Sequence, residues 1–277
     1  CCFALFFYLD LILNVQQHSE LAGRSDFVFR FGMIPFKFWA LWVCHIVLLC
    51  LLIVTSFVDI DHMEIPLSVT LTGIVFGLIL STIFPYPWPA EVIEIPPKPR
   101  IPLAAPRLPI GLQLWPVWYP IPEWIGAGTW KMGLINSIAG ILAALILLRM
   151  IRFLFKVGRG VEGLGIGDAD LMMMVGAFIG WQGVVIAFFV SVLPALIIGL
   201  FQLIVAGRQA MAFGPCLALG SLITMFGWHW LPGELAFVFF DAGLLGVLAA
   251  AGCVFMIVIS TILRLTGPPV DPTTSGD

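Results

Sequence analysis

Two aspartates lie at the borders of long apolar runs. Asp168 closes the segment Gly165-Ile166-Gly167-Asp168 and opens one run, and Asp59 lies just past the end of another. Ionisable side chains are costly at a membrane boundary, so these two indicate chemistry more than solubility. Paired carboxylates can hydrolyse a peptide bond: a protonated acid polarises the scissile carbonyl, and an ionised acid activates water. Since two close carboxylates do not both ionise easily, the proton belongs to the pair.

Residues around the two aspartates complete the candidate site. Glycines before Asp168 have no Cβ, so we expect them to let a substrate backbone approach closely and to adopt positive φ. Asp61 and Asp170 each follow one of the two aspartates by two residues, and Pro66 follows Asp59 in the same short segment. The candidate loop-shaping or substrate-binding residues are Gly165, Gly167, Asp61, Pro66 and Asp170.

The composition identifies the solvent of the chain as lipid. Of its 277 residues, 61% are hydrophobic and only 10% are charged, which is typical of an integral membrane protein. A net charge of -3 without basic tracts argues against a nucleic-acid partner.

The apolar runs predict an all-α fold. Their continuity, without period-2 alternation, favours helices over a barrel. A shorter apolar stretch after Asp168, residues 170–180, predicts a half-length helix, and the G-x-x-x-G spacing of Gly176 and Gly180 predicts close helix approach. We therefore expect a polytopic transmembrane bundle of about six to eight helices. The runs that approach or exceed the ~20 residues of a full span are Phe38–Phe57, Leu67–Phe84, Met132–Ile151, Gln182–Ala206 and Ala236–Leu265.

Polar and proline-rich segments divide the chain. Twelve prolines between residues 85 and 130 exclude a spanning helix there, and the tryptophans among them fit an extended loop against the lipid interface. The predicted parts are a truncated first membrane helix with a polar loop (1–37), two helices flanking the Asp59 loop (38–84), a Pro/Trp-rich extramembrane loop (85–130), a helical bundle carrying Asp168 (131–265) and a disordered tail (266–277).

The chain begins Cys-Cys rather than with Met, and its first apolar run, Cys1 to Asn14, is shorter than a span. We therefore expect an N-terminal portion to precede Cys1.

Membrane crossings predict that both aspartates face one side. One span leads away from Asp59, the proline-rich loop turns, and the next span returns before Asp168. Basic residues in the short link before Asp168 indicate that this side is the cytoplasm. Those residues are Arg149, Arg152, Lys156 and Arg159.

Three segments resemble one known family. The first segment is Phe57 to Pro66, the second is Gly165 to Asp168 followed by Gly176 and Gly180-Trp181, and the third is Phe213-Gly214-Pro215. Their order and spacing resemble those of the type IV prepilin peptidases, or leader peptidases. These are polytopic G-x-G-D aspartic proteases. The likeness covers roughly Phe38 to Trp230. It implies that Asp59 and Asp168 are the catalytic pair and that Asp61 is a neighbour.

The resemblance implies an activity. The family removes the leader peptide of type IV prepilins or type II secretion pseudopilins at the cytoplasmic face of the bacterial inner membrane, with the lipid bilayer as its other partner. No cofactor and no metal are expected. Many members also methylate the new N-terminus with a domain that carries paired C-x-x-C motifs. The six cysteines here form no C-x-x-C, so either the portion before Cys1 carries that domain or the protein is a peptidase only; for this chain we expect peptidase activity without methyltransferase activity.

Two positions depart from the family pattern. Leu67-Ser68 follows Pro66 where the family usually has Asp or Asn, and we expect Ser68 to cap the following helix one residue later. Asp170 replaces the usual basic residue after the second catalytic acid, which leaves the role of that cation unfilled.

Other interpretations remain open. Asp168 could instead be the N-cap of the half-length helix. Asp59-x-Asp61-His62 could instead be a metal site, although one short cluster is weak support for that interpretation. A presenilin-type G-x-G-D protease would share the chemistry but cut within a transmembrane helix. A transporter, channel or assembly scaffold would keep the helices without needing both acids.

Overall fold

The computed structural model describes residues 2–12, 36–84, 92–94, 107–109, 129–159, 165–206, 212–227 and 242–266. The predicted polar loop before residue 36, most of the Pro/Trp-rich loop, residues 160–164 of the basic link and the tail after Thr266 lie outside these residues.

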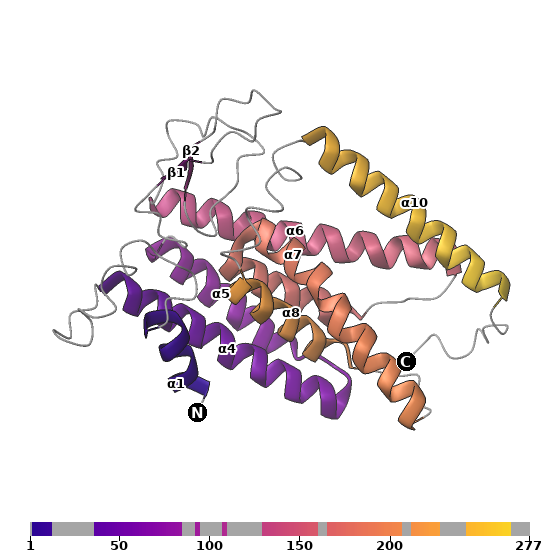
Figure 1. The fold of residues 1–277 in the computed structure, drawn as a ribbon, viewed down its shortest axis with the longest axis horizontal. Coiled ribbons are helices and arrows are strands. Elements are labelled where there is room, and N and C mark those ends of the chain that lie inside the picture. Colours follow the sequence, from indigo (N-terminus) through magenta and orange to yellow (C-terminus); the bar gives the residue numbers. More distant parts are fainter. Residues whose placement is uncertain are drawn as a thin grey trace.

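The described part of the chain is a bundle of helices (Figure 1). Two three-residue antiparallel strands in the Pro/Trp-rich segment are a small addition to the predicted all-α class, which is otherwise confirmed. The elements are α1 (Cys2–Phe7), a π-helical turn η1 (Tyr8–Ile12), α4 (Phe36–His62), α5 (Leu67–Ile83), β1 (Val92–Glu94), β2 (Arg107–Pro109), α6 (Trp130–Arg159), α7 (Ile166–Ala206), α8 (Gly214–Gly227) and α10 (Ala242–Thr266).

Three of the described helices are long and apolar enough to cross a membrane, judged by length and composition. They are Trp39–His62 within α4, Trp130–Gly158 within α6 and Ile166–Gly199 within α7. Shorter apolar helices lie in α5, α8 and α10. These elements agree with the predicted helical membrane bundle.

Helix α4 ends later than the sequence predicts. It continues through Asp59 to His62, so the placement of Asp59 just past the helix was wrong. Each residue added to a formed helix closes one more backbone hydrogen bond, which lets the helix run into its polar end. The carbonyl oxygen of Asp59 accepts the amide of Met63 at 2.9 Å, and Met63 has a φ of 54°. This left-handed residue ends α4.

Helix α5 begins one residue after Pro66. Pro66 is the N-cap residue, with φ -69° and ψ 117°, and its carbonyl oxygen accepts the amides of Val69 and Thr70. No side chain caps this helix, and Ser68 lies inside its first turn. The prediction that Ser68 is the cap was wrong, because the extended backbone at Pro66 already provides the start.

Helix α7 is broken at Gly180, where φ is 77° and ψ is -179°. Residues 166–179 therefore form the half-length helix that the sequence predicts. One turn before the end of that half, the carbonyl oxygen of Ala177 accepts hydrogen bonds from the hydroxyls of Ser81 in α5, at 2.9 Å, and Ser137 in α6, at 2.7 Å. Neighbouring helices thus supply donors where the regular helix is interrupted.

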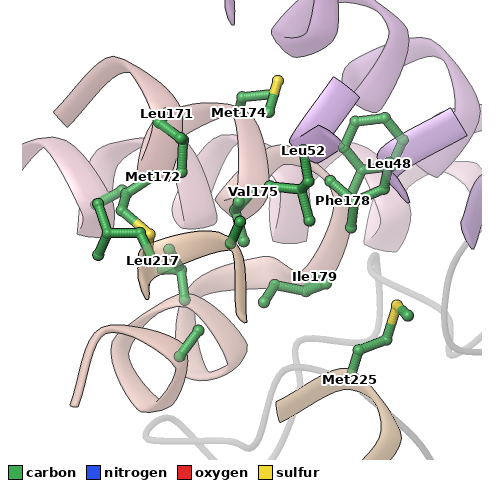
Figure 2. Packing of buried hydrophobic residues seen from close by; sticks show 14 of the residues in the cluster. Leu48, Leu52, Leu171, Met172, Met174, Val175, Phe178, Ile179, Leu217 and Met225 are labelled. Atoms are coloured by element: carbon green, nitrogen blue, oxygen red, sulfur yellow. The ribbon is translucent and has the colours of Figure 1, made fainter. Parts of the chain in front are cut away.

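The first half of α7 is the centre of the core. Its side chains pack with Leu48 and Leu52 of α4 and with Leu217 of α8 (Figure 2). The fully buried residues of this half are Leu171, Met172, Met174, Val175 and Ala177.

Small residues let the neighbouring helices approach this core. A Cβ on Gly140 of α6 would overlap the carbonyl oxygen of Gly176, and a Cβ on Gly180 would overlap the side chain of Asn136. The close approach predicted from Gly176 and Gly180 is therefore confirmed. Helix α10 contacts α6 at the edge of the bundle (Figure 1).

Candidate active site

Asp59 lies in the last turn of α4 and is only 5% exposed. Its Oδ2 accepts a hydrogen bond of 2.8 Å from the backbone amide of Gly214, the first residue of α8. The two residues are 155 positions apart in the chain. The bond therefore ties the first acid to an element that comes much later in the chain.

The start of α8 explains why this amide is available. A helix leaves its first amides without partners inside the helix. The carbonyl oxygen of Phe213 accepts the amides of Cys216, at 3.0 Å, and Leu217, at 3.1 Å. Pro215 has no amide hydrogen. Gly214 is the remaining donor of this turn, and it donates to Asp59.

Asp168 lies in the first turn of α7 and is 9% exposed. Its Oδ2 accepts a hydrogen bond of 3.2 Å from the amide of Gly165. The alternative interpretation of Asp168 as the N-cap residue is therefore wrong, because Asp168 is the third residue inside the helix. Its carboxylate does bond an amide at the helix start, as the acid of a capping box does.

The fold brings the two acids together. Their carboxylates lie close enough to interact electrostatically. The Gly165–Asp168 segment also packs on the turn after α4, since a Cβ added to Gly167 would lie 2.9 Å from the Cβ of Ile65. The contact joins the two segments that the sequence analysis selected and agrees with the prediction that both acids lie on one side.

The two glycines act differently from the prediction. Neither Gly165 nor Gly167 has a positive φ; among the described glycines only Gly180 does. That part of the prediction was wrong because Gly167 already belongs to the regular helix α7. Its missing side chain makes room for Ile65 of the same chain.

The remaining candidate residues lie around this pair. Asp61 is exposed at the end of α4, and Pro66 is the N-cap of α5. Asp170 is half-buried in α7 and interacts electrostatically with Arg149 of α6. Residue 170 is thus an acid, and a cation from the neighbouring helix lies within electrostatic reach of it.

Two residues of this site were not predicted from the sequence. Gly214 was named only as part of the Phe213-Gly214-Pro215 segment, with no role, although a glycine before proline at a helix start signals an amide with no partner inside the helix. Cys216 was given no role in the site, and its buried thiol lies within electrostatic reach of Asp59. No sequence signal relates Cys216 to Asp59.

No group of three or more metal-ligating side chains occurs among the residues that the structure describes.

Comparison with known proteins gives matches to one family. Residues 107–200 match the type IV leader peptidase family. This range contains Gly165 to Asp168, whereas Asp59 and Gly214 lie outside it.

Curated relatives are similar to this chain over stretches of equal or greater length. A prepilin leader peptidase/N-methyltransferase of Burkholderia pseudomallei is 33% identical over 94 residues, which are 32% of this chain and 30% of the relative. The protein of that name from Pseudomonas putida is 30% identical over 112 residues, 39% of this chain and 34% of the relative. The one from Xanthomonas campestris is 28% identical over 185 residues, 65% of this chain and 48% of the relative.

The chain thus spans between about a third and a half of the length of these relatives. No solved structure gives a significant match. Residues 107–200 therefore resemble the type IV leader peptidase family, and the chain is similar to proteins named prepilin leader peptidase/N-methyltransferase over stretches of 94 to 185 residues.

Proposed function

We propose that this chain is a membrane-embedded aspartic endopeptidase that removes the leader peptide of type IV prepilins or type II secretion pseudopilins. Asp59 and Asp168 are its catalytic residues. The observations that support the proposal are two buried carboxylates from α4 and α7 within electrostatic reach of each other, each bound through one oxygen to a backbone amide, and the packing of Gly167 on Ile65 between their segments.

This arrangement suits the hydrolysis of a peptide bond. Among the described residues, the amides of Gly214 and Gly165 are the hydrogen-bond donors to the two carboxyl groups. The second oxygen of each group is then available to water or substrate. Burial keeps both charges from being solvated, which favours one shared proton over two ionised acids.

The reaction needs only this pair and water. The ionised acid takes a proton from water while the water oxygen bonds to the scissile carbonyl carbon, and the protonated acid gives its proton to the carbonyl oxygen. A proton then passes to the leaving nitrogen, the C–N bond breaks, and the products are a carboxylic acid and an amine. The pair ends with its single proton.

The proposed location of the site is the cytoplasmic face of the bacterial inner membrane. Arg149, Arg152 and Lys156 at the end of α6 support this orientation by the excess of cations on cytoplasmic links. A prepilin leader that ends at the membrane surface would meet the acids there.

Of the two activities in the relatives' names, we propose only the peptidase activity for this chain. The sequence contains no C-x-x-C motif, and the described free cysteines Cys44, Cys50, Cys216 and Cys253 are distributed over α4, α8 and α10. The expected outcome of an assay with S-adenosylmethionine is cleavage without methyl transfer.

The test compares isosteric variants of the whole chain in lipid vesicles with a prepilin substrate. Asp59→Asn and Asp168→Asn should each lower kcat by about 10³-fold or more, because each removes one member of a unit. Asp61→Asn, on the exposed end of α4, is the matched control and should cleave within about threefold of wild type. Cleavage that survives either of the first two changes contradicts the proposal.

A further inference from the structure

We propose that Gly214 is a positioning residue for the reaction: its amide holds one oxygen of Asp59 and leaves the other turned to water and substrate. This inference rests on the proposed function. It gives a role in catalysis to the start of α8, a segment that contributes no acid of its own.

The hydrogen bond is short and sheltered. It measures 2.8 Å, and both Gly214 and Asp59 are buried. A bond from an amide to a carboxylate is stronger than one between neutral groups, and here water does not compete with it. The bond comes from the first turn of a helix of 14 residues, whose positive end adds to the attraction for a carboxylate.

The identity of residue 214 follows from the same geometry. A Cβ on residue 214 would lie 2.6 Å from Oδ2 of Asp59, 3.1 Å from its Cγ and 3.3 Å from its Cβ. Every side chain would therefore push the carboxylate out of position, while glycine gives the amide direct access. The requirement for glycine comes from the acid it faces.

Asp59 needs this support because its own helix ends beside it. The chain leaves α4 at Met63, in a left-handed conformation, four residues after the acid. The amide from α8 is the hydrogen bond that anchors the carboxylate to another helix among the described residues. Since misplacing a reacting group by about 1 Å can cost about 10²-fold in rate, this anchor is part of the machinery.

The experiment uses two alanine variants of the same helix. Gly214→Ala disturbs Asp59. Gly220→Ala is its matched control, since the added Cβ would lie 2.6 Å from the Cβ of Ser191 and away from both acids. Both variants should unfold at a lower temperature than wild type. Only Gly214→Ala should also lose kcat, by about 10²-fold, with KM within about twofold.

A second measurement is independent of cleavage. In an Asp59→Ala background the carboxylate is gone, so Gly214→Ala should cost much less stability than it does in wild type. Gly220→Ala should cost the same in both backgrounds. If Gly214→Ala alone does not fold, recovery of folding in the Asp59→Ala background still reports the contact, and no recovery overturns the proposal.

The outcomes separate the two proposals. Wild-type chain that cleaves no prepilin overturns the proposed function and the positioning role with it. Wild-type chain that cleaves, together with a Gly214→Ala variant that keeps its kcat, overturns the positioning role alone. Equal costs of Gly214→Ala in the two backgrounds also overturn it, because the contact with Asp59 would then contribute nothing.

Discussion

Both halves of α7 consist mostly of apolar residues, but their surroundings differ. Before Gly180 the helix is almost completely buried, with Leu171 and Val175 at 0% exposure. After Gly180 one face is open, and Leu193 and Leu196 are 63% and 68% exposed. The buried half carries Asp168, whereas the open half presents the kind of surface that lipid covers.

Apolarity alone does not show which half of α7 is enclosed. Lipid tails are as apolar as leucine, so close packing rather than apolarity decides which membrane helices associate. Gly73 and Gly77 of α5 and Gly140 of α6 lie against the first half of α7. Gly220 of α8 lies against Ala187 and Ser191 near the start of the second half. Apolar sequence thus places a helix in the membrane, and small side chains on its neighbours mark where another helix packs closely against it.

The largest expected effect comes from filling the closest of these contacts. Gly176→Ala should destabilise the protein by about 3 kcal/mol or more, because its Cβ would overlap the backbone of Gly140 and force α6 and α7 apart. Thermal unfolding in detergent measures this cost. Leu196→Ala, in the open half, is the control and should change stability by about 0.5 kcal/mol or less. Equal effects would remove the distinction between the halves.

Truncating one leucine in each half tests the comparison directly. Leu171→Ala should cost about 2–3 kcal/mol, because it leaves a cavity in the core. Leu193→Ala should cost about 0.5 kcal/mol or less, since lipid can fill the space. Chemical unfolding of both variants in the same detergent gives the two values. A Leu193→Ala cost as large as that of Leu171→Ala would mean that the second half is covered by protein.

The hydroxyls at the break between the halves should have a smaller, coupled effect. With Ser81→Ala or Ser137→Ala alone, the carbonyl oxygen of Ala177 still accepts a hydrogen bond from the remaining hydroxyl, and the free energy of unfolding should fall by about 0.6 kcal/mol. The double variant leaves a buried carbonyl oxygen without either hydroxyl and should cost more than the sum, about 2 kcal/mol. A double-mutant cycle on unfolding free energies checks this. Strict additivity would show that the two hydroxyls do not share the role.

The smallest effect concerns the other described residue with reversed φ. Gly180 adopts its conformation without a Cβ, whereas Met63 carries a side chain at φ 54° and is exposed. Met63→Gly should relieve part of the ~1 kcal/mol strain of a left-handed residue. The expected gain of about 0.5 kcal/mol is measurable as a rise in unfolding temperature. A loss of stability would indicate that the Met63 side chain makes a contact worth more than the strain.

Much of the fold could be predicted because lipid leaves few choices. Continuous apolar runs must be helices, and a short run after Asp168 followed by Gly180 predicts the half-length helix that is observed. The break itself follows from the glycine. The acids were recognisable because charged residues are rare in such a chain.

Contacts between elements that are distant in the chain could not be predicted from the sequence. The bond between Gly214 and Asp59 and the approach of Arg149 to Asp170 depend on how helices rotate against each other, and apolarity on all sides of a helix does not fix that rotation. The end of α4 was missed for a local reason, because a methionine in a left-handed conformation is an unusual stop signal.

The long separation between Asp59 and Gly214 sets an order for biosynthesis. Both acids have left the ribosome before residue 214 is made, so an early intermediate holds the two carboxyl groups without the α8 amide. Under the proposed function, the site is therefore complete only when α8 enters the bundle.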